Sequence, residues 1–216
     1  MSCKGSITNG TFTVTESSFE GFGGAVETGR TAARIQVRSS DFALNDVAVF
    51  TAEPMGGQLV IDRNEVTSID RERSVGGSFG FFVVPGESPA LGDRVQVRVT
   101  NNDITIPNAG DGVIIVQGPT PLTSRVRGNT ISLNQENTAG IVLVGATAGS
   151  VTDNSVSGLR DVGVILPRSS GVTVRGNTFA DASGSADILL TPDSSNNTVI
   201  AGGATVLDLG TDNDIR

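Results

Sequence analysis

Three carboxylate side chains recur at one position of a repeated pattern, and their spacing could support chemistry. Asp41, Glu65 and Asp103 each follow an apolar residue by four positions. A fold that stacks the repeats would bring them into a line, with neighbours about 5 Å apart. Like charges at that spacing repel, so either arginine side chains balance them or a bound cation such as Ca²⁺ does. The sequence therefore makes this line a candidate ligand-binding or cation-binding site.

Arginines near the same positions favour a simpler interpretation of the carboxylate line. Arg38, Arg63 and Arg127 follow their own apolar anchors by one or two positions. They could form a solvated network of ion pairs with the carboxylates, which is common on protein surfaces and contributes little stability. We favour this network over a cation site, and no cofactor other than Ca²⁺ is suggested.

The carboxylates belong to a repeat of about two dozen residues that runs through most of the chain. An apolar anchor is followed five positions later by a second apolar residue, and the clearest copies are residues 126–131, 151–156 and 174–179. Steps between anchors are 23 to 27 residues, except for one of 38 residues. Such self-similarity is the signature of a solenoid. The anchors are Val14, Val37, Ile61, Val99, Val126, Val151, Val174 and Val199.

A second short apolar run follows each copy, for example GIVLV at 140–144 and VGVIL at 162–166. The turns between runs are not the two-residue Asn-Gly type that makes a hairpin, so strands must pair with equivalent strands of the next repeat. No long window has helical periodicity, and we expect helix in less than about a tenth of the chain. The sequence predicts an all-β fold, a parallel β-helix of about eight coils.

Two positions of the repeat are expected to hold the coils together. Asn three positions after the anchor suits a sharp bend, and its amide can bond the next coil, which predicts a hydrogen-bonded ladder. Residues five positions after the anchor are all apolar and should face the core, with Phe42 buried between Phe19 and Val66. The ladder position holds Ser17, Ser40, Asn64, Asn102, Asn129, Asn154 and Asn177, and the core position holds Phe19, Phe42, Val66, Ile104, Ile131, Val156 and Phe179.

The repeat predicts a single domain over residues 1–216, because each unit contacts only its neighbours and cannot fold alone. The 38-residue step requires a loop insertion, which we place near residues 70–78. An extended loop on a rigid scaffold is a common place for binding residues. Its alternating charges are more typical of a solubilising loop, which is the interpretation we prefer.

Composition excludes several classes of function. The formal charge is −8, which disfavours nucleic acid as a partner because phosphate binding needs clustered positive charge. The chain has no His, Trp or Tyr, so a Ser-His triad and an imidazole base are excluded, and any glycan contact must be mainly polar. No apolar run approaches the length of a transmembrane helix and no signal peptide precedes the repeat, so membrane insertion is not expected.

The pattern V-x-x-N-x-[IVF], followed by G-[IV]-x-[LIV], resembles the right-handed parallel β-helix repeats of the pectate-lyase-like superfamily, especially NosD-type carbohydrate-binding and sugar-hydrolase modules. The resemblance covers roughly residues 10 to 215. It implies a right-handed helix, an extracellular or cell-envelope location and an acidic polysaccharide partner. The Gly-His-Gly of polygalacturonases and the Asp-Pro-His of alginate epimerases are impossible without histidine. Lyases of this fold that use calcium-binding acids with an arginine or lysine base remain compatible with the composition.

Two functions follow from these observations. The first is a non-catalytic secreted or surface β-helix module, structural or binding a polysaccharide or a surface protein. The second is a polysaccharide lyase or hydrolase that uses the carboxylate line and an arginine. The absence of histidine and of spare aromatic residues favours the first. Unpaired strand edges at the ends of a β-helix would also allow oligomerisation.

Overall fold

The structure is a computed structural model, and it describes residues 10–28, 34–43, 45, 47–52, 57–67, 79–84, 95–106, 112–118, 122–134, 139–159, 161–181 and 184–216. Within these residues 24 strands form three sheets, and none of the described residues is helical. All pairs of named strands are parallel. The all-β parallel solenoid predicted from the repeat is therefore confirmed.

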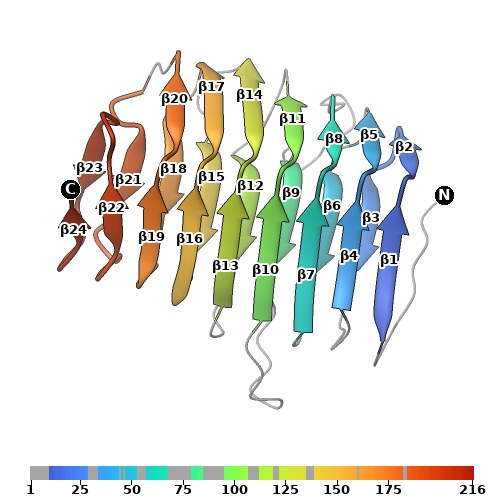
Figure 1. Ribbon diagram of the computed structural model, residues 1–216, viewed down its shortest axis with the longest axis horizontal. Helices are drawn as coiled ribbons and strands as arrows, with labels where there is room; N and C mark the ends of the chain where they lie inside the picture. The colour runs from blue at the N-terminus through green and yellow to red at the C-terminus, as the bar shows by residue number, and fades with distance from the viewer. Residues whose placement is uncertain are drawn as a thin grey trace.

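The first sheet, which we call sheet A, contains nine strands in the order of the repeats. They stand side by side along the long axis of the molecule, from blue at one end to red at the other (Figure 1). Each anchor pairs in register with the anchor of the next coil, as in Val14 with Val37. The strands are β1 Thr11–Thr15, β4 Arg34–Arg38, β7 Gly57–Asp62, β10 Val95–Thr100, β13 Leu122–Arg127, β16 Ala148–Thr152, β19 Val172–Arg175, β22 Thr198–Ile200 and β24 Asp214–Ile215.

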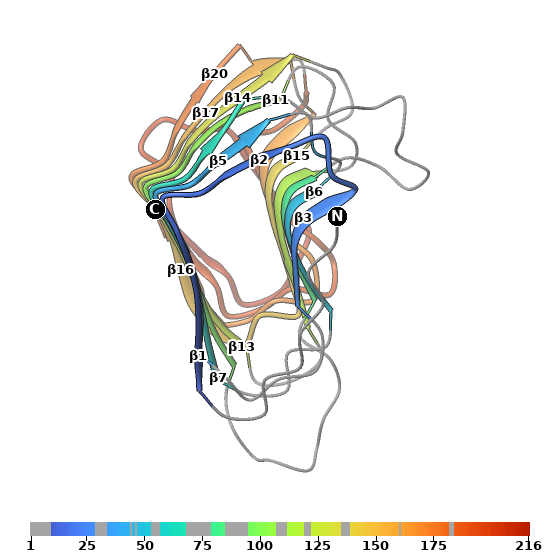
Figure 2. The ribbon, with the colours of Figure 1, turned by 90° about the vertical axis from the view of Figure 1, so that its right-hand side faces the viewer.

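Two further sheets complete the first seven coils, in which the chain passes from sheet A to sheet B and then to sheet C. Seen along the stack, the three sheets form three walls around the core (Figure 2). Sheet B consists of β2 Ser18–Glu20, β5 Asp41–Ala43, β8 Glu65–Val66, β11 Asp103–Ile106, β14 Thr130–Asn134, β17 Ser155–Leu159 and β20 Thr178–Ala180. Sheet C consists of β3 Gly24–Thr28, β6 Val47–Ala52, β9 Phe79–Val84, β12 Gly112–Gln117, β15 Ala139–Val144, β18 Val162–Leu166, β21 Ile188–Leu190 and β23 Val206–Asp208.

The core is built from the columns that the repeat predicts. The anchors from Val37 to Val199 are fully buried. Phe42 is 1% exposed, its ring stacks on Phe19 with centroids 5.1 Å apart, and Val66 lies beside it in register. The expected burial of Phe42 is confirmed. Phe19 and Phe179 are only half-buried, because they lie in the first and last strands of sheet B and have no neighbouring sheet B strand on one side.

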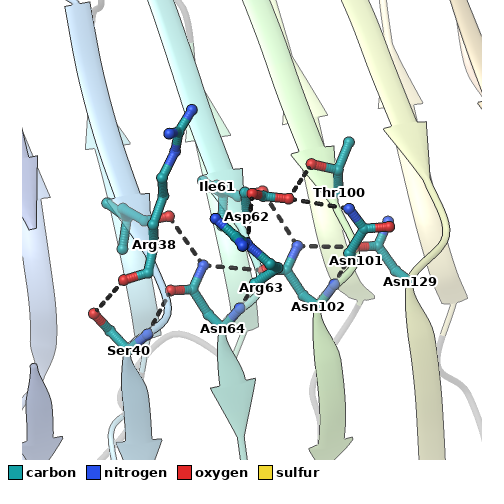
Figure 3. Close-up of polar contacts among 11 residues, drawn as sticks. Arg38, Ser40, Ile61, Asp62, Arg63, Asn64, Thr100, Asn101, Asn102 and Asn129 are labelled. Carbon is teal, nitrogen blue, oxygen red and sulfur yellow. Dashed lines mark hydrogen bonds and ion pairs between the residues drawn. The ribbon is translucent and has the colours of Figure 1, made fainter. Parts of the chain in front are cut away.

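The predicted asparagine ladder runs along the corner between sheets A and B (Figure 3). The backbone N–H and the Nδ2 of Asn102 both donate to Oδ1 of Asn129, at 3.0 and 2.8 Å. The Nδ2 of Asn129 donates in turn to Oδ1 of Asn154 at 2.9 Å and to the carbonyl oxygen of Val99 at 3.0 Å. Each amide in the middle of the ladder thus joins its own coil to both neighbouring coils.

The sharp bend at this corner lies one residue earlier than expected. The residues with positive φ directly precede the ladder position, and they include Arg63, Asn101 and Asp153 at 55°, 55° and 57°. At Gly128 and Gly176 the same position is glycine, with φ of 65°. The ladder asparagines are therefore selected for their amide hydrogen bonds and not for a left-handed backbone, which corrects the role we gave them.

The long step between two anchors and the C-terminal end of sheet A can also be compared with the predicted repeat. Ile61 and Val99 pair in register although 38 residues separate them, so the extra residues lie in the connections on either side of β9. The insertion predicted near residues 70–78 lies outside the described residues. At the other end β24 adds a ninth strand to sheet A that the repeat did not predict, with Ile215 in register with Val199.

Candidate functional site

The structure brings the predicted carboxylate line together on the outer face of sheet B. Asp41 is in register with Glu65, and Glu65 with Asp103, so the three occupy adjacent strands. All three residues are exposed. The prediction that the repeat places them side by side and toward solvent is confirmed.

The network of ion pairs expected around this line is not formed among the described residues. Arg63 instead donates through Nε to Asp62 at 3.1 Å, and Arg127 pairs with Asp153 at 3.1 Å. No described cluster of three or more His, Cys, Asp or Glu residues is arranged to hold a metal ion. Cation binding at the line stays a prediction, which a calcium titration of the melting temperature would test.

A different set of charged residues gathers on the outer face of sheet A. A groove of about 360 Å³ crosses four neighbouring strands, β4, β7, β10 and β13. Its charged lining is five arginines and one aspartate, with Val60, Thr100 and Asn101 between them. The charged residues are Arg34, Arg38, Asp62, Arg98, Arg125 and Arg127.

Alternation along the strands directs the arginines into the groove. In β10 the side chains of Val95, Val97 and Val99 are buried, so Arg98 must point to solvent. The same alternation in β13 leaves Arg125 and Arg127 outside. The core pattern of the repeat therefore determines which side chains the groove can contain.

Arg98 and Arg125 are the central feature of the groove. They are directly in register on adjacent strands, about 4.8 Å apart in the backbone. Both are exposed, and within the described part of the chain neither guanidinium has a hydrogen bond or an ion pair. Like charges directly opposite each other destabilise a sheet. An anion bound between them would relieve this repulsion.

The one carboxylate in the groove is already engaged by other groups. Thr100 Oγ1 and Asn101 Nδ2 donate to Asp62 Oδ1 at 2.7 and 3.1 Å, and Arg63 Nε donates to Oδ2 (Figure 3). Burial by itself would raise the pKa of the Asp62 carboxyl, but these hydrogen bonds and the Arg63 charge outweigh that effect and lower the pKa. Arg38 is in register with Asp62, yet no ion pair joins the two side chains. The buried Nε of Arg38 has no hydrogen-bond partner among the described residues.

The groove is positively charged on a protein that is negative overall. Five arginines and one aspartate give its lining a formal charge of +4, whereas the whole chain carries −8. Two ion-pair partners lie just outside the lining, Asp153 beside Arg127 and Arg63 beside Asp62. Their charges are opposite, so including both leaves the formal charge at +4. Guanidinium groups bind carboxylate, sulfate and phosphate groups through paired hydrogen bonds. The arrangement is therefore suited to an anionic ligand.

This groove was not predicted from the sequence, because the predicted site occupies another column of the repeat. Arg38 and Arg127 were assigned to the carboxylate line, but the structure places them in the groove on sheet A. Arg98 and Arg125 were not singled out at all. A signal was present, because arginine directly precedes the anchor in two successive repeats, in Val-Arg-Val at 97–99 and Ser-Arg-Val at 124–126.

Comparison with known proteins identifies the fold family of the chain. A family model described as a right-handed beta helix region matches residues 77–216, which agrees with the handedness expected from the repeat. Neither the curated proteins nor the solved structures gave a significant match. Within the described residues there is no helix of the length and apolarity needed to cross a membrane.

Proposed function

Because the chain belongs to the right-handed β-helix family, we propose that it is a non-catalytic β-helix module that binds an acidic polysaccharide through the groove on sheet A. An extracellular or cell-envelope location is part of this proposal, since such polymers occur there. A surface protein with an acidic face is the alternative partner.

The observation that carries the proposal is the exposed pair formed by Arg98 and Arg125. Within the described residues, Arg98 and Arg125 have no carboxylate partner, which leaves a local excess of positive charge in an acidic protein. Carboxylates of a glycan can accept paired hydrogen bonds from such groups and remove their mutual repulsion. A neutral polysaccharide cannot, which makes charge the basis of selection.

The surroundings of the arginine pair also suit a saccharide. Gln96 and Thr123 lie on the same outer face and provide an amide and a hydroxyl group for sugar hydroxyls. The chain has no Trp or Tyr, so recognition depends on polar contacts and not on stacking against those rings. Such binding weakens as salt screens the charges.

A lyase or hydrolase that combines the carboxylate line with an arginine receives less support. The line lies on sheet B, whereas Arg98 and Arg125 lie on sheet A. No described arginine forms an ion pair with Asp41, Glu65 or Asp103.

Calorimetry with polygalacturonate, and with a neutral galactan as the control polymer, tests the proposal. We expect the protein to bind only the acidic polymer, and added sodium chloride to weaken binding. The double variant Arg98→Ala and Arg125→Ala should lower affinity at least about tenfold, since charge-assisted hydrogen bonds are lost. Arg175→Ala is the matched control, because Arg175 is exposed on the same sheet but lies outside the groove. Equal binding of both polymers, or no binding of either, would contradict the proposal.

A further inference from the structure

The outer face of sheet C is apolar, although the other two sheets present charged and polar side chains to solvent. We infer that this face is a dimer interface, through which two copies of the chain lie side by side along the length of the solenoid. The interface occupies a different wall of the molecule from the groove on sheet A, so it does not depend on the proposed function.

The strands of sheet C have the composition of strands that are covered on both faces. Within their bounds, the six sheet C strands from β6 to β21 contain no charged residue, and Glu27 and Asp208 lie in the first and last strands of the sheet. Such near-continuous apolar strands are typical of sheets buried on both sides. All 24 described strands belong to the three sheets, so none of them covers the outside of sheet C (Figure 2).

Alternation along the strands shows which apolar side chains point outward. Ile165 in β18 is half-buried, although the residues on either side of it are fully buried. Val142 in β15 and Leu189 in β21 alternate in the same way and are in register with Ile165. Leu207 continues the column in β23 and is 39% exposed. From β15 to β23 the outside of sheet C therefore carries an apolar stripe that runs along the solenoid axis.

A second copy of the chain matches the period of this stripe. Its side chains repeat at the rise of one coil, about 4.8 Å, and a facing surface must have the same repeat to interdigitate with it over several coils. Another copy has that repeat by construction, and a twofold axis places the stripe against itself. The two sheets would then pack face to face about 10 Å apart, as the sheets of a β-sandwich do.

Charge favours the side of the solenoid over its ends as the contact. The chain has a formal charge of −8, so two copies repel each other wherever their acids meet. Contact through sheet C brings together six strands without charge, and its two acids lie at the margins. Stacking end to end would instead bring together the acids of the first and last coils, which are Glu16, Glu20, Glu27, Asp208, Asp212 and Asp214.

The area of the face requires contact over its whole length. Its eight strands span about 34 Å along the solenoid, and six of them have five or six residues, a length of about 17 Å or more. The face therefore offers about 600 Å² on each copy, or about 1,200 Å² for both copies together. That total is at the lower limit for a stable interface, and half of it is typical of a crystal contact. The two solenoids must therefore overlap fully.

Sedimentation velocity of the full chain over a range of concentrations tests the inference, and we expect an equilibrium between monomer and dimer. Ile165→Asp should raise the dissociation constant of the dimer at least about a hundredfold, because it places an unpaired carboxylate of each copy in the interface. Ser155→Asp is the matched control, since Ser155 is exposed on sheet B of the same coil and the added charge is the same. The double variant Arg98→Ala and Arg125→Ala should dimerise like the unchanged protein, because sheets A and C are opposite walls (Figure 2).

Small-angle X-ray scattering of the unchanged protein locates the contact without any variant. A side-by-side dimer keeps the length of one solenoid, about 38 Å over the nine strands of sheet A, and has a wider cross-section. Circular dichroism checks that each variant is folded, and if Ile165→Asp does not fold, the length measured by scattering decides. A monomer at every concentration up to the solubility limit would overturn the inference. A dimer of doubled length, or one that a folded Ile165→Asp leaves unchanged, would overturn it as well.

Discussion

Asp62 shows how one residue connects the stability of the fold with the charge of the groove. Its carboxylate accepts hydrogen bonds from Thr100 and Asn101 on the next coil and from Arg63 on its own coil. The same carboxylate limits the positive charge that the groove presents. A substitution at Asp62 should therefore affect both coil-to-coil stability and ligand selection.

The lowered pKa of Asp62 predicts a pH dependence of stability. A carboxyl group with a lower pKa in the folded protein stabilises it above the unfolded pKa, and this contribution is lost as the pH falls through the folded pKa. We therefore expect the free energy of unfolding to fall below about pH 4, and to fall less steeply in Asp62→Asn. Urea denaturation at neutral and acidic pH measures this difference. The same loss on acidification in both proteins would show that Asp62 does not contribute.

A second prediction for a single residue concerns Phe42 in the core. Phe42→Ala should lower the free energy of unfolding by about 3–5 kcal/mol, because the ring is fully buried between two coils and the cavity cannot close completely. Phe19→Ala is the matched control and should cost less, since Phe19 is half-buried in the first strand of sheet B. A loss below about 1 kcal/mol for Phe42→Ala would contradict the packing described here.

At the level of elements, the asparagine ladder adds side-chain hydrogen bonds between successive coils to those of backbone pairing. Asn129→Ala leaves the buried Nδ2 of Asn102 without its Asn129 acceptor and removes two bonds that Asn129 itself donates. Each buried group left without a partner costs about 1–3 kcal/mol. We expect Asn129→Ala to destabilise the protein more than Asn177→Ala, whose half-buried amide lies at the end of the ladder. Urea denaturation of both variants decides this, and equal losses would contradict it.

The sequence predicted the strands and their pairing more completely than it predicted the groove. The strands, their parallel register and the inward columns follow from the repeat, because stacking must place equivalent residues such as Val99 and Val126 together. The groove depends on outward positions, where the core imposes no residue type, and an arginine directly before the anchor recurs in only two repeats, at Arg98 and Arg125. The strand that contains Ile215 escaped prediction because only two residues pair there.

At the scale of the whole molecule, the groove depends on which coils the solenoid contains and on the order in which they stack. Each coil contacts only its neighbours, so a complete coil can be removed while the remaining coils stack again. Positive charge is concentrated in the coils from β4 to β13, and a deletion inside that region should act differently from one outside it. The ladder corner provides equivalent cutting points in successive coils.

Deletion of residues 102–128 joins Asn101 to Asn129 and removes β11, β12 and β13, and with them Arg125. Deletion of residues 129–153 joins Gly128 to Asn154 and removes the next coil, but keeps every arginine of the groove. Both joins keep a left-handed corner residue before a ladder asparagine, so we expect both proteins to retain an all-β circular dichroism spectrum and a cooperative melt. Only the first should lose binding to polygalacturonate, because β10 would then pair with β16 and Arg98 would lie beside Ser150 instead of Arg125. Equal affinity of the two folded proteins would locate the binding surface elsewhere on the solenoid.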